Sequence, residues 1–470
     1  MKNYKIIIIV ITLLLISGVG YYFTNKYGSN ADIKVSSSTY NGDGTKVDLN
    51  NQENTFNITT GGTYELTGTM TNGIVIESDD DVTLVLNGVS IIAEYPINIK
   101  QGDVKIVIND GSTNYVEYTK AYDENEEVNG AIYSKDDLVI EGNGSLEIKS
   151  TYNGIVSKDS VTIESGTITI SAYNNGIKGK DSVVINGGNY TITAGNDAIK
   201  STNEDDETLG YIEINGGTFN INSTGDGITA ATNLTINNGD FTIKTGEGYV
   251  STSKTADFNS WNNTTQIDDE SIKGLKANTL ITINGGTFNL NTEDDSIHSN
   301  GNIIIKNGAF TIKSSDDGIH ADGLVEINGG TFDITASEGI EATYVKINDG
   351  TININATDDG INAANKSNNY KTIVEINGGN TTIKMGQGDT DGVDSNGDII
   401  INGGTINVTG QSTFDYDGTG TINGGTVISN GEQITTLPNQ FMGGGMQGQM
   451  GGNMQRGNMP QGNMGRGQRR

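Results

Sequence analysis

The sequence predicts an all-β protein, a right-handed parallel β-helix in which the chain forms a solenoid of about a dozen coils with three short strands per coil. Three observations lead to this fold. A motif of the form Val-x-Ile-Asn-Gly-Gly-Thr-Phe-x-Ile recurs along the chain, for example from Val325 to Ile334, and most copies are 20 to 23 residues apart. Apolar and polar residues alternate within each copy, and glycine-rich turns separate the apolar runs.

The alternation is typical of strands, and the spacing lacks the leucine pattern of leucine-rich repeats. Stacked coils would bury the apolar face of each strand against its neighbours, which no single repeat could do alone. The turn residues align in one column: Glu164, Asn186, Asn215, Asn237, Asn284, Lys306, Asn328, Asn348, Asn377, Asn402 and Asn423. We predict that an aromatic column with the parity of the core isoleucines is also buried: Phe219, Phe241, Phe288, Phe310 and Phe332.

The two ends of the chain differ from the repeats. Lys2 and Lys5 precede an apolar run from Ile6 to Phe23, with no clear cleavage site after it. This length is close to that of a membrane span, so we predict an uncleaved anchor with the rod outside the cell, and a cleaved signal segment as the alternative. The predicted division is residues 1–30 for this segment, 31–436 for the β-helix and 437–470 for a disordered tail rich in Gly, Met, Gln and Arg.

Charge is distributed unevenly between the rod and the tail. The chain has a net charge of −30, yet all of its arginines lie in the tail, at Arg456, Arg466, Arg469 and Arg470. A strongly anionic rod is incompatible with nucleic acid binding, whereas the basic tail could hold an anionic polymer of the cell wall. The absence of cysteine from the sequence excludes disulfides and thiol catalysis.

Acidic residues recur at one corner of the predicted coil, as in Asp316-Asp317-Gly318-Ile319. Carboxylates stacked one coil apart would repel one another and raise one another's pKa. Calcium would offset the repulsion, because it accepts six to eight oxygen ligands in loose geometry. The alternative is that Asp and Asn occupy this corner because they tolerate turn geometry and hydrogen-bond the neighbouring backbone, with no metal. The candidate calcium ligands are Asp197, Asp226, Asp294, Asp295, Asp316, Asp317, Asp322, Asp358, Asp359, Asp389, Asp391 and Asp394.

Other side chains near this corner are candidates for ligand binding. His298 and His320 occupy the same place in consecutive repeats and are predicted to stack outward beside the acids. Lys178 and Lys200 lie near the same column, and their pKa values should be raised in so anionic a rod. Trp261, in the insertion from Thr252 to Thr279, is a candidate sugar platform, and the alternative is that it only pins this loop against the rod. Insertions after Ser201, Ser251 and Ala364 are predicted to leave the coil at the same point and to wall a groove.

These residues resemble a known family, the extracellular carbohydrate-binding β-helix proteins of clostridia and relatives, which share the pectate-lyase-like architecture. The resemblance implies calcium in the turns and binding of acidic plant polysaccharide such as polygalacturonate, or of cellulose, without established catalysis. Some relatives have a lipid-modified cysteine where this chain has the apolar segment. The segments that carry the resemblance include Val82 to Val89, Ser134 to Leu138, Asn153 to Ile155, Lys178 to Asp181, Ile297 to Gly301, Asp317 to Gly323, Glu338 to Glu341 and Asp415 to Gly418.

We therefore predict calcium-dependent, non-catalytic binding of a pectic or cellulosic polysaccharide at the cell surface. A lyase of this architecture would use a basic side chain, which is commonly arginine. The rod contains no arginine. A hydrolase would use paired aspartates, but catalytic pairs do not recur in register along a whole solenoid. A lyase or hydrolase is thus the first alternative, and a structural surface protein with purely structural calcium is the second.

Overall fold

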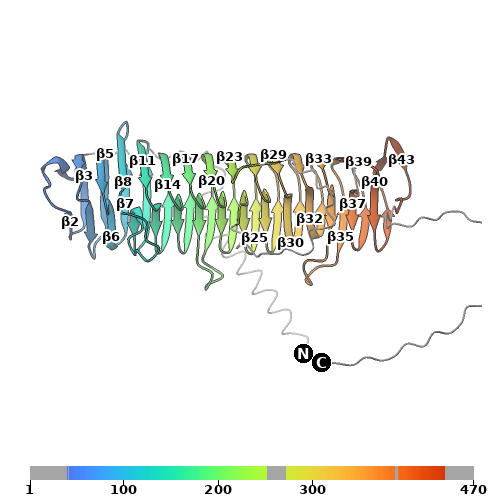
Figure 1. Ribbon diagram of the computed structural model, residues 1–470, viewed down its shortest axis with the longest axis horizontal. Helices are drawn as coiled ribbons and strands as arrows, with labels where there is room; N and C mark the ends of the chain where they lie inside the picture. The colour runs from blue at the N-terminus through green and yellow to red at the C-terminus, as the bar shows by residue number, and fades with distance from the viewer. Residues whose placement is uncertain (1–39, 41, 251–270, 387–389, 440–470) are drawn as a thin grey trace, which may run out of the picture.

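The chain winds into one long rod, a parallel β-solenoid of about 16 turns (Figure 1). The computed structural model describes residues 40, 42–250, 271–386 and 390–439. Within them are 43 strands and one short 3-10 turn, η1 (Leu49–Asn51). The predicted fold class is confirmed, but the count of about a dozen coils was too low. The coils before Glu164 lack the Asn-Gly-Gly turn, so the repeat alignment did not count them.

Each coil contributes one strand to each of three parallel ladders, which we call A, B and C in chain order. Ladder A contains β7 (Val104–Ile108), β10 (Leu138–Gly142), β13 (Ser160–Ile163), β16 (Ser182–Ile185), β19 (Tyr211–Ile214), β22 (Asn233–Ile236), β25 (Leu280–Ile283), β28 (Asn302–Ile305), β35 (Ile373–Ile376), β38 (Asp398–Ile401) and β41 (Gly420–Ile422). Ladder B contains β8 (Thr113–Tyr118), β11 (Ser145–Ser150), β14 (Thr167–Ala172), β17 (Asn189–Ala194), β20 (Thr218–Ser223), β23 (Asp240–Thr245), β26 (Thr287–Thr292), β29 (Ala309–Ser314), β31 (Thr331–Ala336), β33 (Thr351–Ala356), β36 (Asn380–Met385), β39 (Thr405–Thr409) and β42 (Thr426–Ser429).

Ladder C carries the acidic corner at its start. It contains β2 (Phe56–Ile58), β4 (Ile74–Glu77), β6 (Ile97–Gln101), β9 (Gly130–Ser134), β12 (Asn153–Ser157), β15 (Ile177–Gly179), β18 (Ile199–Ser201), β21 (Ile228–Ala230), β24 (Leu275–Ala277), β27 (Ile297–Ser299), β34 (Ile361–Ala363), β37 (Asp391–Ser395) and β40 (Ser412–Tyr416).

A few strands depart from the three-strand coil. β30 (Asp317–Ile327) and β32 (Glu338–Ile347) run through ladder C into ladder A without a break. At the amino-terminal end β1 (Thr45–Asp48), β3 (Gly62–Met70) and β5 (Val82–Ala93) pair in the same parallel sense. The last strand, β43 (Glu432–Ile434), folds back antiparallel onto β42. This return strand covers part of the final coil edge, which would otherwise present unpaired backbone groups.

The core runs along the whole axis of the rod. Alternate residues of each B strand are buried, and the predicted aromatic column lies inside, with exposed fractions of 1 to 3 %. Its rings stack in parallel at 4.6 to 4.9 Å between centroids, and Tyr190 extends the stack by one coil. The sequence prediction that these phenylalanines form core rather than a sugar-binding surface is therefore confirmed.

The asparagine column forms a ladder of side-chain amides along the A-to-B corner. Asn215 Nδ2 donates to Asn186 Oδ1 at 2.7 Å, and Asn237 repeats this contact with Asn215 at 2.6 Å. The second glycine of the same turn has positive φ, as at Gly217 with 120°. Other residues adopt this backbone conformation only at a cost, which explains the recurrence of Gly-Gly in the motif.

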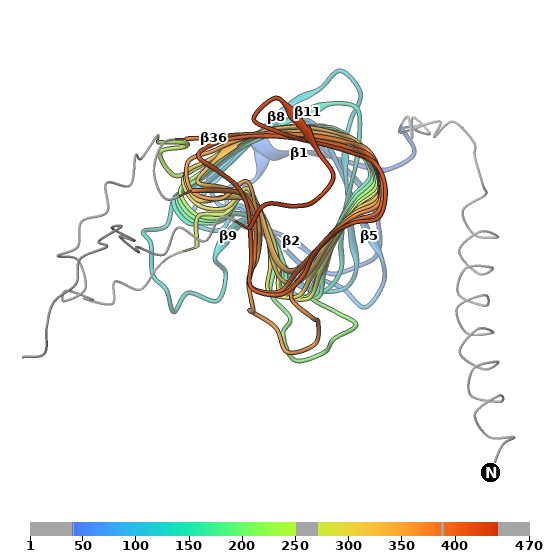
Figure 2. The same cartoon turned by 90° about the vertical axis from the view of Figure 1, so that its right-hand side faces the viewer.

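The insertions leave the coil at two different corners. Residues 202–210 and 364–372 both follow a C strand and project on the same side of the rod (Figures 1 and 2). The insertion that begins near Val250 instead lies between β23 and β24, before its C strand. The predicted common exit point is therefore wrong for this insertion, because Tyr249 and Val250 follow ladder B and do not belong to ladder C.

Several predicted features lie outside the described residues: the segment 1–30, Trp261, Asp389 and the tail beyond residue 439. Among the residues that are described, no helix has the length and apolarity needed to cross a membrane.

Candidate functional site

The predicted acidic corner and the start of ladder C form two parallel columns of side chains. The first, which we call the corner column, contains Asn153, Asn175, Asp197, Asp226, Lys273, Asp295, Asp317, Glu338, Asp359, Asp391 and Ser412. The second, the strand column, lies three residues later in each coil and contains Lys178, Lys200, Thr229, Lys276, His298, His320, Glu341, Asn362, Asp394 and Asp415. Lys273 interrupts the corner column, which the sequence analysis treated as polar and acidic throughout.

Many corner aspartates have a structural role that needs no metal. Asp197 Oδ1 accepts a hydrogen bond from the backbone N–H of Asp226 in the next coil at 2.9 Å. Asp295 accepts in the same way from Asp317 at 3.0 Å, and Asp359 from Asp391 at 3.0 Å. These carboxylates therefore tie one coil to the next, as the turn-based alternative in the sequence analysis predicted.

In the middle of the rod, protein cations neutralise the corner column. Lys200 Nζ lies 2.7 Å from Asp197, and Lys273 Nζ lies 2.5 Å from Asp294 and 3.3 Å from Asp295. Burial alone would raise the pKa of Asp295, but the hydrogen bond with His298 and the charge of Lys273 outweigh it and hold that pKa below its usual value. Asp295 therefore stays ionised without calcium.

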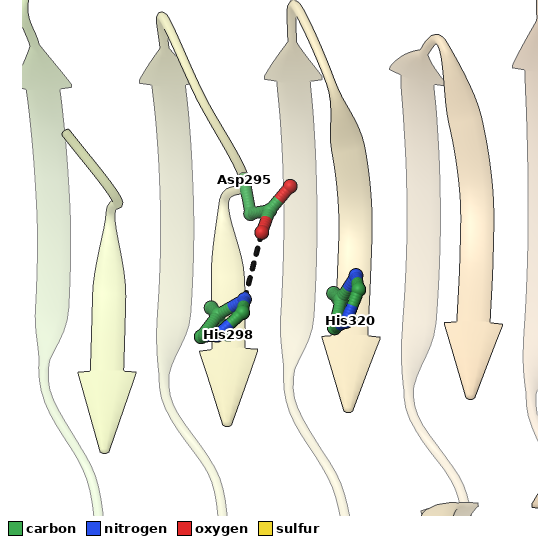
Figure 3. A group of neighbouring side chains, drawn as sticks. All are labelled: Asp295, His298 and His320. Carbon is green, nitrogen blue, oxygen red and sulfur yellow. Dashed lines mark hydrogen bonds and ion pairs between the residues drawn. The ribbon is translucent and has the colours of Figure 1, made fainter. Parts of the chain in front are cut away.

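The two histidines belong to this neutralised region. His298 and His320 stack with ring centroids 4.8 Å apart, and His298 Nδ1 lies 2.7 Å from Asp295 (Figure 3). His320 Nδ1 lies 2.6 Å from Asp317. The two histidine side chains are only 13 % and 11 % exposed, so the predicted stack exists but does not face the solvent as expected. The acids on either side bury the rings, a feature that the repeat spacing alone does not reveal.

His320 contacts carboxylates in two coils. Its Nδ1 also lies 3.0 Å from Glu341, which in turn pairs with Lys366 Nζ at 2.5 Å. Burial opposes a charged imidazole, but the hydrogen bonds with Asp317 and Glu341 raise the pKa of His320 to about 10. His320 is thus a buried cation that compensates the acids around it.

Beyond His320 both columns become acidic or neutral. In the described part of the chain, no ion pair includes Asp359, Asp394 or Asp415. Burial raises the pKa of Asp359 to about 8, with Glu338 and Asp394 adding repulsion, and raises that of Asp394 to about 6, with Asp391 and Asp415 contributing. In the middle of the rod, burial also raises the pKa of Asp226, with repulsion from Asp197, and that of Asp317, with repulsion from Asp295. The repulsion predicted from the sequence is therefore present there too, but only in the carboxyl-terminal coils does it lack protein cations beside the acids.

Three carboxylates converge in these last coils. Asp391, Asp394 and Asp415 each bring an oxygen atom within 4.8 Å of the others. The buried Ser412 lies opposite Asp391 in the ladder and Asn362 lies opposite Asp394. Within the described residues, Ser412 Oγ and Asn362 Oδ1 have no hydrogen-bond partner. Oxygens that share one calcium ion lie up to about 5 Å apart, so the three carboxylates have a spacing that suits calcium. We call these five residues the terminal oxygen cluster.

The structure separates the other predicted ligands from this cluster. Asp294, Asp295 and Asp316 bring oxygens within 4.8 Å of one another, but Lys273 already pairs with the first two. Asp322 is 43 % exposed and lies 3.6 Å from His320. Asp358 lies beside Asp359, while Asp226 pairs with Lys276 at 3.9 Å. The candidates thus divide into neutralised acids and a smaller group at the end of the rod.

The sequence analysis missed several of the charges that make this division. Glu341, Lys276 and Asp415 all belong to the strand column, and each could have been found by aligning the residue after the first buried apolar residue of every C strand. Lys273 follows an insertion that obscures its register, and Lys366 lies in another insertion. Ion pairs made by inserted residues cannot be predicted from the repeat pattern.

The lysines correct another expectation. Lys178 was expected to have a raised pKa, but burial lowers it, and Lys200 and Lys158 add repulsion. Lys178 and Lys200 face each other in adjacent coils. The net charge of the rod therefore does not predict the local environment of Lys178, because its nearest neighbours include other cations.

Comparisons with known proteins give a family. The family model described as carbohydrate-binding domain-containing protein matches residues 52–318 and 316–440. A relative from Acetivibrio thermocellus with that same description is 37 % identical over 146 residues, which is 28 % of this chain and 50 % of the relative. The match thus spans only half the length of that relative.

A solved structure is also similar. It is described as the polysaccharide lyase-like protein from C. thermocellum in a gadolinium derivative. It is 36 % identical in sequence, with a TM-score of 0.40, and the match covers 44 % of this chain and 86 % of that protein.

Proposed function

This chain belongs to the family of carbohydrate-binding domain-containing proteins, and on that premise we propose that it binds an acidic, polygalacturonate-like polysaccharide through calcium at the terminal oxygen cluster, without catalysis. The observation that supports this proposal most is the change in charge along the rod. Lysine or histidine side chains pair with the acids as far along the rod as Glu341. In the last coils, Asp359 and Asp394 have raised pKa values.

The terminal oxygen cluster has the composition of a calcium site. Asp391, Asp394 and Asp415 would hold the ion, and Ser412 Oγ and Asn362 Oδ1 are buried oxygens that need a partner. A bound calcium ion would supply positive charge and leave coordination positions for oxygens of the ligand. A uronate carboxylate could occupy such a position, which explains how an anionic rod would hold an anionic polymer.

The test is isothermal titration of the full-length protein with oligogalacturonate, in calcium and again in chelator. Asp394→Asn is the informative variant, because it removes a charge from the cluster but keeps the side-chain shape. Asp333→Asn is the matched control, since Asp333 is an exposed residue of β31 on another face of the coil. We expect calcium-dependent binding by wild type and the control, and at least roughly tenfold weaker binding by Asp394→Asn.

Two results would contradict the proposal. Equal binding in calcium and in chelator would remove the bridging role of calcium. Calcium binding without oligogalacturonate binding would instead favour a surface protein in which calcium is purely structural, with the basic tail 437–470 as the part that holds an anionic wall polymer.

A lyase is the second candidate, and the lowered pKa of Lys178 is the observation that favours it. A lyase needs its base beside the uronate whose carboxylate is neutralised. Lys178 and Asp394 are eight coil steps apart in the strand column, or roughly 40 Å at about 4.8 Å per coil. The calcium cluster and this base therefore cannot act on one sugar residue. Unsaturated product from purified protein and pectin would nevertheless establish the lyase.

We propose a cell-surface location, with residues 1–30 as a membrane segment and the rod outside. Calcium is abundant outside cells, where sites with dissociation constants of about 10⁻⁴ to 10⁻³ M are loaded. An open cluster of three carboxylates suits this range. Labelling of intact cells with an antibody against the rod would test the location.

A further inference from the structure

The ladder of side-chain amides along the A-to-B corner is interrupted in the middle of the rod. Asn284 Nδ2 donates to Asn237 Oδ1 at 2.6 Å, but the next residue of the column is Lys306, which has no amide. The ladder resumes beyond Asn328. At the interruption the asparagine of the turn is Asn307, one residue after the column. This turn therefore carries its amide outside the ladder.

Asn307 is exposed, and its amide is held only within its own turn. The equivalent residues in the preceding and following coils are Gly285 and Gly329, so neither coil places a side chain there. Within the described residues, the only hydrogen bond of the Asn307 side chain is the one that Oδ1 accepts from the backbone N–H of Gly308 at 2.9 Å. Its Nδ2 donates to no group in this part of the chain, so nothing holds the amide nitrogen in place.

The same contact places a nucleophile next to an electrophile. Because a C=O bond is about 1.23 Å long, the backbone nitrogen of Gly308 lies no farther than about 4.1 Å from Asn307 Cγ. Groups held together in this way react as if each were present at a very high concentration. Glycine also has no side chain that would hinder the approach of its nitrogen to the carbonyl carbon.

The fold requires glycine after Asn307. Gly308 has a φ of 145°, and a Cβ atom at this residue would lie 2.7 Å from the ring of Phe310. Phe310 belongs to the buried aromatic column, so its ring cannot move aside without disturbing its neighbours in the stack. Packing of the core therefore fixes an unhindered backbone nitrogen beside this asparagine.

We propose that Asn307 is a self-modification site, at which the chain converts the side-chain amide to a carboxylate without an enzyme. The nitrogen of Gly308 forms a bond to Asn307 Cγ, and its proton leaves with the side-chain nitrogen as ammonia, which gives a cyclic succinimide. Water then opens this ring at either carbonyl and yields an aspartyl or an isoaspartyl residue. The net reaction exchanges ammonia for water and needs no oxidant, reductant or cofactor.

The aspartyl product has a counterpart elsewhere in the rod. Asp349 is the equivalent residue two coils later, and its Oδ1 accepts from the backbone N–H of Gly350 at 2.8 Å, in the same way as Asn307. The turn thus accommodates a carboxylate, which in the product adds a negative charge next to Lys306. The isoaspartyl product would instead lengthen the main chain in a turn whose backbone pairs with both neighbouring coils, and it should weaken that pairing.

Asn238 offers a comparison within the same molecule. It is the equivalent residue two coils before Asn307, is also exposed, and precedes Gly239, which has a φ of 140°. Within the described residues, however, the Asn238 side chain makes no hydrogen bond to the backbone nitrogen that follows it. Any reactivity that an Asn-Gly sequence has by itself is common to both sites, whereas the contact with the nucleophile is specific to Asn307.

The test is peptide mapping by mass spectrometry of the full-length protein after storage at mildly alkaline pH, folded and in urea. In the folded protein we expect at least about fivefold more conversion at Asn307 than at Asn238, because only Asn307 is held against its nucleophile. In urea this contact is lost, so the two sites should agree within about twofold. Asn307→Gln is the control for the assignment, since its longer side chain would have to close a six-membered ring, and it should remove the signal.

The outcomes are decisive in both directions. Preferential conversion of Asn307 that disappears in urea supports the self-modification site. No conversion of Asn307 in the folded protein, equal or faster conversion of Asn238, or a preference that urea leaves unchanged would overturn it. None of these results depends on carbohydrate or calcium binding, because Asn307 lies at the A-to-B corner, whereas the terminal oxygen cluster belongs to the start of ladder C.

Discussion

The imidazole of His320 lies 3.0 Å from the carboxylate of Glu341 in the next coil, and this contact marks the point where the charge balance of the rod changes. On the amino-terminal side Lys200, Lys273 and His320 lie beside corner acids. On the carboxyl-terminal side the acids Asp359, Asp394 and Asp415 have no described ion pair. A single pair of side chains thus separates a region stabilised by its own charges from a region that suits a bound cation.

Replacement of His320 should destabilise the rod strongly. In His320→Ala, Asp317 and Glu341 would lose the cation between them, although their side chains are only 7 % exposed. Removal of one partner from a buried pair costs about 3 to 5 kcal/mol. His298→Ala should cost less, because Lys273 remains 3.3 Å from Asp295. Urea denaturation of both variants measures the difference, and equal losses would contradict this account.

Stability should fall as the pH rises through the alkaline range. The pKa of His320 is raised to about 10 from 6.5, so its contribution is fully present below the lower value and is lost as the pH approaches the higher one. Asp317, Glu341, Asp295 and Asp322 all face the ring, and His298 stacks on it. His320→Gln cannot titrate, so its urea midpoint should vary less between about pH 7 and pH 10 than that of wild type.

The fold was predictable because one local pattern repeats. Every Asn-Gly-Gly turn indicates the same coil geometry, and so does every alternating strand, such as β26 with Phe288. Many copies of the pattern therefore support one prediction. The first coils were missed because β3 and β5 replace short strands and turns by long strands. Burial of the phenylalanine column could be predicted because these residues alternate in step with the core isoleucines of the same strands.

The candidate site was only partly predictable. The repeat placed Asp295, Asp317 and Asp359 in one column, but whether each has a cation beside it depends on side chains in other coils and in insertions. Lys366, which pairs with Glu341, comes from such an insertion. The exposed rings of Tyr122 and Tyr173 are in contact although the two residues are two coils apart. No single repeat contains that information.

Phe288, in the middle of the stacked column, should be among the residues most sensitive to truncation. Its ring packs between Phe241 and Phe310 at 4.9 and 4.7 Å, and it is 1 % exposed. Phe288→Ala should cost about 3 to 5 kcal/mol, since a cavity would remain between two rigid coils. Asn289→Ala is the matched control, because Asn289 is the exposed neighbour on the same strand. Urea unfolding followed by circular dichroism would measure both, and a loss below about 1 kcal/mol for Phe288→Ala would indicate that the coils can close the gap.

Calcium should stabilise the rod more at alkaline than at acidic pH. Burial raises the pKa of Asp394 to about 6, of Glu338 to about 7 and of Asp359 to about 8. Without calcium, protons neutralise these groups in the folded state, so their contribution is present below about pH 4 and is lost as the pH rises through these values. Asp394 belongs to the terminal oxygen cluster, where calcium would replace its proton once the group ionises. At a concentration 100 times its dissociation constant, one ion should add about 2.7 kcal/mol at about pH 8 and much less at about pH 5. Thermal unfolding with calcium and with chelator measures both values. Asp394→Asn should reduce the effect and Asp333→Asn should not, whereas an equal effect of calcium at both pH values would place the ion away from these carboxylates.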